Sequence, residues 1–154
     1  MRRPMPANSP LRSQRFGGSL WLSAGSGYMD VLIMERDQLV GSMLADTLVA
    51  EGISAAVLAD EEVLRLPPDH SPQLVITGLN RTHNEDLTGL RVISVLRRKW
   101  PQLCVIYLAA LWPTRLSRQA LMAGERFLSK PVGLAAITRM VRELLASGQC
   151  RPSG

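Results

Sequence analysis

The chain has 154 residues, a formal net charge of +5 and a hydrophobic content of 46%. This length and apolar content predict one domain with a buried core. Residues 1–29 hold four arginines and no acid, so they account for +4 of the charge and residues 30–154 carry only +1. We therefore expect a disordered basic leader at 1–29 and no nucleic-acid partner.

No apolar run approaches the ~20 residues that a membrane-spanning helix needs. The leader also lacks the continuous apolar segment of a signal peptide. Cys104 lies in an apolar run and Cys150 near the end of the chain. From their separation and different surroundings we expect two free thiols, a reduced cytoplasmic setting and no contact with a membrane.

Strand-like and helix-like segments alternate from Asp30 onward. The expected elements of the first half are a strand at Val31–Met34, a helix at 38–51, a strand at 53–58 and a short helix at 60–66. The apolar spacing in the first helix predicts one buried face, made of Leu39, Met43, Leu44, Thr47 and Leu48. Gly52 is a typical stop signal for that helix.

The alternation continues through the second half. The expected elements are a strand at 74–77, a helix ending near Trp100, a strand at 104–108, a helix at 113–124, a strand at 126–129 and a helix at 134–147. Pro101 ends the first of these helices, because helical geometry is disfavoured before proline. The pattern predicts a single α/β domain at 30–147 with five parallel strands and five helices, and a disordered tail at 148–154.

The carboxyl ends of parallel strands meet in one crevice, where chemistry is usually placed. Polar and small residues follow the expected strands at these ends: Glu35, Arg36, Asp37, Gly78, Ala109, Lys130 and Pro131.

Four segments, in order and spacing, resemble a response-regulator receiver domain over about residues 30–146. They are the acidic start at 31–37, the strand at 72–80, the strand at 105–110, and the Ala-Gly turn, strand and Lys-Pro pair at 123–132. The resemblance implies a flavodoxin-like, doubly wound fold and a role in a phosphorelay.

The chain departs from the family at three places. Gly78 stands where the family has the phosphoacceptor aspartate, and it has no carboxylate to form an acyl phosphate. Ala109 replaces the family's Thr or Ser, and Arg36 replaces the second acid beside Glu35 and Asp37. A guanidinium there opposes Mg²⁺ binding. We therefore expect a degenerate receiver that is not phosphorylated, binds no metal or cofactor, and is not an enzyme.

Three further positions match the family. Lys130 stands at the place of the lysine in the family's Lys-Pro pair, and we expect a salt bridge from Lys130 to Glu35 across the crevice. By resemblance, Pro131 follows a cis peptide bond. Phe127 stands at the place of the switch aromatic, and we expect it to pack in the core.

Without an acceptor, we expect the protein to act by protein–protein contact. In the family, the face formed here by 113–124, 126–129 and 134–147 mediates dimerisation or docking. On this chain it would display Trp112, Arg115, Arg118, Arg139 and Arg142. The expected partner is a signalling protein such as a histidine kinase, or a second copy of the chain.

Two alternatives remain. An ordinary phosphorelay receiver would use a displaced acid such as Glu85 or Asp86. A small-molecule-binding protein or enzyme on the same fold is the other, although no glycine-rich phosphate-binding turn follows the first strand. His70 and His83 lie in polar loops, where solvated histidines are commoner than phosphoryl acceptors.

Overall fold

The computed structural model describes residues 15–16, 19–20, 29–68, 70–79, 86–109, 124–131 and 133–150. Its centre is a parallel five-stranded sheet in the order β4-β3-β5-β6-β7. The strands are β3 (Val31–Met34), β4 (Ala55–Val57), β5 (Leu74–Leu79), β6 (Cys104–Ala109) and β7 (Glu125–Ser129). The predicted sheet is confirmed.

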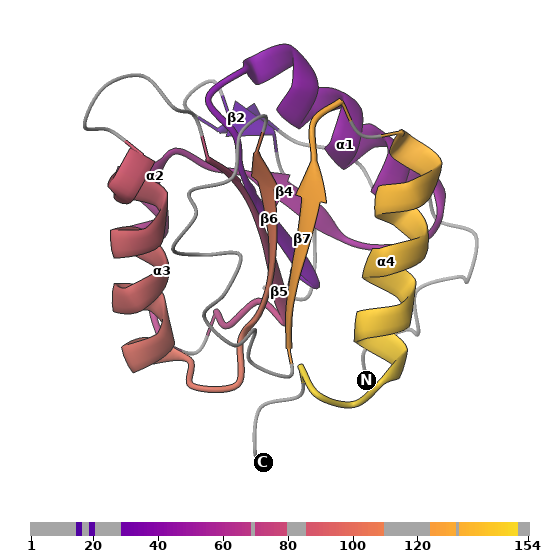
Figure 1. The fold of residues 1–154 in the computed structure, drawn as a ribbon. Coiled ribbons are helices and arrows are strands. Elements are labelled where there is room, and N and C mark those ends of the chain that lie inside the picture. Colours follow the sequence, from indigo (N-terminus) through magenta and orange to yellow (C-terminus); the bar gives the residue numbers. More distant parts are fainter. Residues whose placement is uncertain are drawn as a thin grey trace, which may run out of the picture.

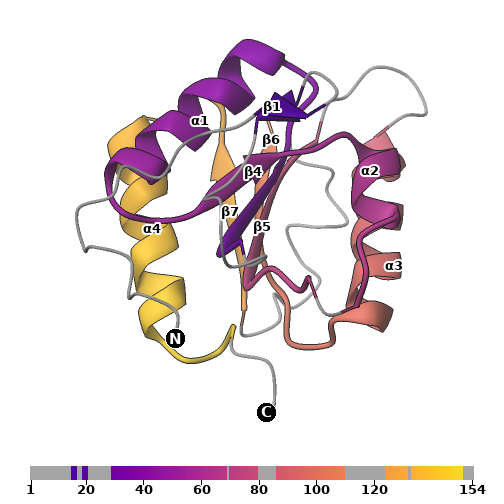
Figure 2. The ribbon, with the colours of Figure 1, turned by 180° about the vertical axis from the view of Figure 1, so that it is seen from behind.

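Helices cover both faces of this sheet (Figures 1 and 2). The helices α1 (Gln38–Ala50) and α4 (Leu134–Ala146) lie on one face, and α2 (Asp60–Leu64) and α3 (Asp86–Lys99) lie on the other. The predicted helix at 113–124 lies outside the described residues. The strand order changes direction between β3 and β5, the switch point at which doubly wound sheets place their ligands.

Each face of the sheet has its own apolar core. Leu32 and Val75 belong to the cluster on the side of α2 and α3, whereas Ile33 and Ile76 belong to the cluster on the side of α1 and α4. Successive strand residues point to opposite faces, so a strand buried on both sides must be apolar throughout. This explains why the strands appear in the sequence as short continuous apolar runs.

The buried face of α1 differs from the prediction. Leu39 and Met43 are 70% and 47% exposed. The residues that face the core are Gly41, Leu44, Ala45 and Leu48. A Cβ at Gly41 would come within 3.1 Å of Cγ1 of Val57, so the small residue lets α1 lie close to the sheet. Close approach through Gly41 turns Leu39 and Met43 outward.

Some element boundaries also move. β5 continues past the predicted end at Thr77 through Gly78 to Leu79, because both residues pair with β6. α3 spans Asp86–Lys99 and so ends next to Trp100, as predicted. Gly52 follows α1 with a φ of 83°, as expected for a residue that ends a helix.

A short antiparallel hairpin lies within the leader that was predicted to be disordered. It pairs β1 (Arg15–Phe16) with β2 (Ser19–Leu20). The structure differs from the prediction at these residues, and the rest of 1–28 lies outside the described part of the chain.

The two cysteines form a disulfide, so the prediction of free thiols is wrong. Cys104 begins β6, and Cys150 lies just beyond α4, after Gly148 with a φ of 78°. The turn brings the two Cα atoms to 5.2 Å across 46 residues of sequence. Both cysteines are buried, and neither carries a local signal of the pairing.

Within the described residues, no helix combines the length and the apolar character needed to cross a membrane.

Candidate functional site

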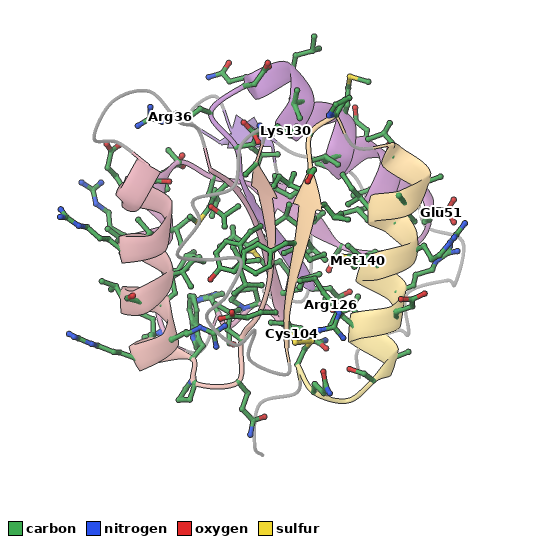
Figure 3. All side chains as sticks on the ribbon, viewed as in Figure 1. Arg36, Glu51, Cys104, Arg126, Lys130 and Met140 are labelled. Atoms are coloured by element: carbon green, nitrogen blue, oxygen red, sulfur yellow. A yellow bond between two sulfur atoms is a disulfide. The ribbon has the colours of Figure 1, made fainter. Side chains whose placement is uncertain are left out.

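The candidate site is the crevice at the carboxyl end of the sheet. Glu35 follows β3, Gly78 lies near the end of β5, Ala109 ends β6, and Lys130 follows β7. Figure 3 shows Lys130 at this end of the sheet and Cys104 at the opposite end. The sheet thus brings together four residues that lie far apart in sequence, as the strand order predicts.

A salt bridge spans the crevice from β3 to β7. Nζ of Lys130 lies 3.2 Å from Oε2 of Glu35, and the two side chains are 27% and 1% exposed. The predicted contact is therefore confirmed. Oε1 of Glu35 accepts a hydrogen bond of 3.3 Å from the backbone N–H of Asp37. Both oxygens of this buried carboxylate are engaged.

The backbone of Lys130 is held at the end of β6. Its N–H donates to the carbonyl of Ala109 at 2.8 Å. The peptide bond between Lys130 and Pro131 is cis, as the resemblance implied. The lysine therefore enters the crevice from a fixed backbone position.

Gly78 lies directly against the Glu35 carboxylate. A Cβ built on Gly78 would overlap Oε2 of Glu35 and lie 2.9 Å from its Cδ. Real Cβ atoms do not approach other heavy atoms this closely, so the glutamate occupies the space that any side chain at this position would need. The sequence signal for this contact is a long acidic side chain at the end of one strand and a glycine at the end of the neighbouring strand.

The residues around the crevice do not fit Mg²⁺. Magnesium requires near-octahedral oxygen ligands. Asp37 uses Oδ1 to accept the N–H groups of Leu39 and Val40, at 3.0 and 3.3 Å, and so caps the N-terminus of α1. Arg36 is exposed beside it. Among the described residues, no group of three His, Cys, Asp or Glu side chains is placed to hold a metal.

Of the two switch-equivalent positions, Ala109 is fully buried and Phe127 is partly buried. Ala109 provides no hydroxyl. Phe127 stacks on Tyr107 with a centroid distance of 4.9 Å and an interplanar angle of 22°. Phe127 also packs against the core cluster on the side of α2 and α3, as predicted.

An ion pair that acts on Tyr107 of this aromatic pair was not predicted from the sequence. Arg97 of α3 pairs with Glu125 of β7 at 2.5 Å. Burial raises the pKa of Tyr107 to about 12, and Glu125 acts in the same direction while Arg97 opposes it. Strand alternation could have found part of this arrangement, because Glu125 and Phe127 share one face of β7.

The predicted docking face is only partly within the described residues. Arg139 is exposed on α4. Arg142 forms an ion pair with Glu51, the residue that caps the C-terminus of α1. Like Arg139, Arg142 is exposed on α4, and the place of both arginines in a docking face stays a prediction. The residues Trp112, Arg115, Arg118, His83 and Glu85 lie outside the described part.

No protein-family model matches the chain. The transcriptional activator protein ExaE of Pseudomonas putida is 31% identical over 123 residues, covering 77% of this chain and 56% of that protein. The chain thus spans about half the length of this curated relative.

Solved structures of receiver domains have the same fold. A response regulator receiver protein from Burkholderia phymatum is 26% identical, with a TM-score of 0.58 over 77% of this chain and 94% of that one. A CheY-like receiver domain protein from Methanospirillum hungatei is 19% identical, with a TM-score of 0.65 over 78% and 95%. The receiver domain of nitrogen regulatory protein C is also 19% identical, with a TM-score of 0.64 over 77% and 95%. The flavodoxin-like, CheY-type fold is therefore confirmed.

Proposed function

We propose that this protein is a receiver-type signalling domain that does not accept a phosphoryl group and acts by contact with another protein. One observation carries the proposal. At the strand end where receivers have an aspartate, the chain has Gly78, and the Glu35 carboxylate fills the space of the missing side chain.

The acceptor and switch positions of this crevice offer neither a carboxylate nor a hydroxyl for phosphoryl transfer. An acyl phosphate needs an accessible carboxylate nucleophile. The Glu35 side chain is 1% exposed and bound to Lys130, and Asp37 is committed to the cap of α1. Ala109 has no hydroxyl to bind a phosphoryl oxygen. These features argue against Glu35 or Asp37 as a phosphoryl acceptor and against an enzyme at this site.

The comparisons support a pathway for the domain. The likeness to the transcriptional activator protein ExaE supports a role in the control of transcription. The likeness to solved receiver domains supports two-component signalling, and our proposal places the protein in the cytoplasm. The partner in this proposal is a signalling protein or a second copy of the chain. Of the described residues in the expected contact face, Arg139 is an exposed cation on α4.

The proposal is tested with a small-molecule phosphodonor. The protein is incubated with acetyl phosphate and Mg²⁺ and weighed intact, beside a receiver domain that retains its acceptor aspartate. We expect a phosphoryl adduct on the control and none on this protein. A stoichiometric adduct would overturn the proposal, and peptide mapping would then identify the displaced acid that the alternative requires.

A further inference from the structure

We infer that Glu35 is a built-in replacement for the carboxylate that this crevice lacks at position 78, and that it holds Lys130 in place without any phosphoryl group. The inference rests on the proposed function only in taking Gly78 as the acceptor position. It assigns to Glu35 the role of a positioning residue for Lys130.

The strand register explains how a residue of β3 supplies a group to β5. Met34 pairs with Thr77 in the parallel ladder, so Glu35 and Gly78 are the next residues of two adjacent strands. The long side chain of Glu35 extends toward β5, so that its Oε2 atom occupies the place of a Cβ on Gly78. Glycine at this position is therefore a condition for the placement of Glu35.

The electrostatics require a partner for this carboxylate. The Glu35 side chain is 1% exposed, and a buried charge is costly unless it is paired and hydrogen-bonded. Lys130 supplies the positive charge, and the N–H of Asp37 supplies a hydrogen bond. The Lys130 side chain remains 27% exposed, so its ammonium group keeps contact with water. The buried carboxylate of Glu35 depends on that ammonium group for its neutralisation.

This arrangement has a consequence for signalling. In a receiver that switches, the anion in the crevice arrives with the phosphoryl group and leaves with it. Here the anion belongs to the chain and is held by the fold. The crevice therefore keeps one arrangement whether or not a phosphodonor is present.

The test moves the carboxylate from one strand to the other. Three variants are compared with the parent by thermal unfolding: Glu35→Ala, Gly78→Asp and the double variant. In the parent background, Gly78→Asp places two carboxylates in the space of one, and we expect a lower melting temperature. In the Glu35→Ala background, the same substitution restores an anion beside Lys130, and we expect the melting temperature to rise by roughly 5 °C.

An uncharged variant separates charge from space filling. Asparagine has the size of aspartate but carries no charge that can pair with the ammonium of Lys130. In the Glu35→Ala background, Gly78→Asn should therefore raise the melting temperature clearly less than Gly78→Asp does. The inference is overturned if Gly78→Asp lowers the melting temperature in both backgrounds, or if asparagine restores as much as aspartate. Either result leaves the phosphodonor experiment unaffected, so the two proposals fail separately.

A second measurement keeps the inference testable if Glu35→Ala does not fold. The chain has two lysines, Lys99 and Lys130, so each acts as a reference for the other in chemical acetylation followed by peptide mass spectrometry. Glu35→Gln keeps the shape of the side chain and removes its charge. We expect acetylation of Lys130 to become several-fold faster relative to Lys99. An unchanged ratio would show that Glu35 does not hold Lys130.

Discussion

Burial changes the acid–base chemistry of a single residue, Tyr107, in the core beside α3. The side chain is 4% exposed and stacks on Phe127. Burial raises the pKa of its phenol from 10.0 to about 12. The folded pKa exceeds the unfolded one, so the stability that the neutral phenol contributes is complete below pH 10. That contribution is lost as the pH rises from 10 to 12.

Alkaline titration should therefore separate the two tyrosines of the chain. We expect the absorbance of ionised Tyr107 to develop near pH 12, and Tyr107→Phe to lack this step. The parent should lose about 2–3 kcal/mol of stability over that interval relative to Tyr107→Phe, measured by urea unfolding. Ionisation of Tyr107 near pH 10 would contradict the burial argument.

At the scale of an element, the start of α1 gives Asp37 a structural role. This residue belongs to an acidic cluster that resembles a metal site, yet its oxygen accepts the N–H groups of Leu39 and Val40. The first N–H groups of a helix have no partner within the helix, so a capping carboxylate stabilises it. The carboxylate of Asp37 therefore stabilises the start of α1.

Removal of this cap should destabilise the domain. We expect Asp37→Ala to lower the free energy of unfolding by about 1 kcal/mol, because two backbone donors lose their partner. Asp46 is exposed on the same helix and serves as the matched control. Asp46→Ala should change stability by less than about 0.5 kcal/mol. Equal effects in chemical denaturation would show that the cap contributes nothing.

At the scale of the whole molecule, the disulfide joins the first residue of β6 to the segment after α4. Cys104 and Cys150 are 1% and 2% exposed. A Cβ at Gly124 would lie 2.9 Å from Sγ of Cys104, so a glycine there leaves room for the sulfur. A thiol can attack a disulfide only when it has access to a sulfur atom. Burial therefore slows the attack of an external thiol on this bond while the protein is folded.

Reduction should lower the stability of the entire domain. The bond closes a loop with a sequence separation of 46 residues, for which we expect a contribution of about 2–4 kcal/mol. Chemical denaturation with and without a dithiol measures this difference. Cys150→Ser should match the reduced parent and be insensitive to the dithiol. A parent that contains two titratable thiols when purified without reductant would contradict the disulfide.

The sequence by itself determined the layout of the domain and most of the crevice. Short apolar runs predict the strands and helical periodicity predicts the helices between them, and both patterns are visible in neighbouring residues. Their alternation indicates five parallel strands. Parallel strands bring their carboxyl ends together, so Glu35, Gly78, Ala109 and Lys130 could be assigned to one site, and the salt bridge could be predicted from opposite charges at that edge.

Only the tertiary structure decided how closely these residues approach. The rotation of α1 depends on the contact of Gly41 with Val57, and the disulfide depends on a turn that ends beside β6. Glu35 enters the space of Gly78 because β3 and β5 lie side by side at a particular register. These features are contacts between residues far apart in the chain, and a pattern read along the chain contains no distance between its strands.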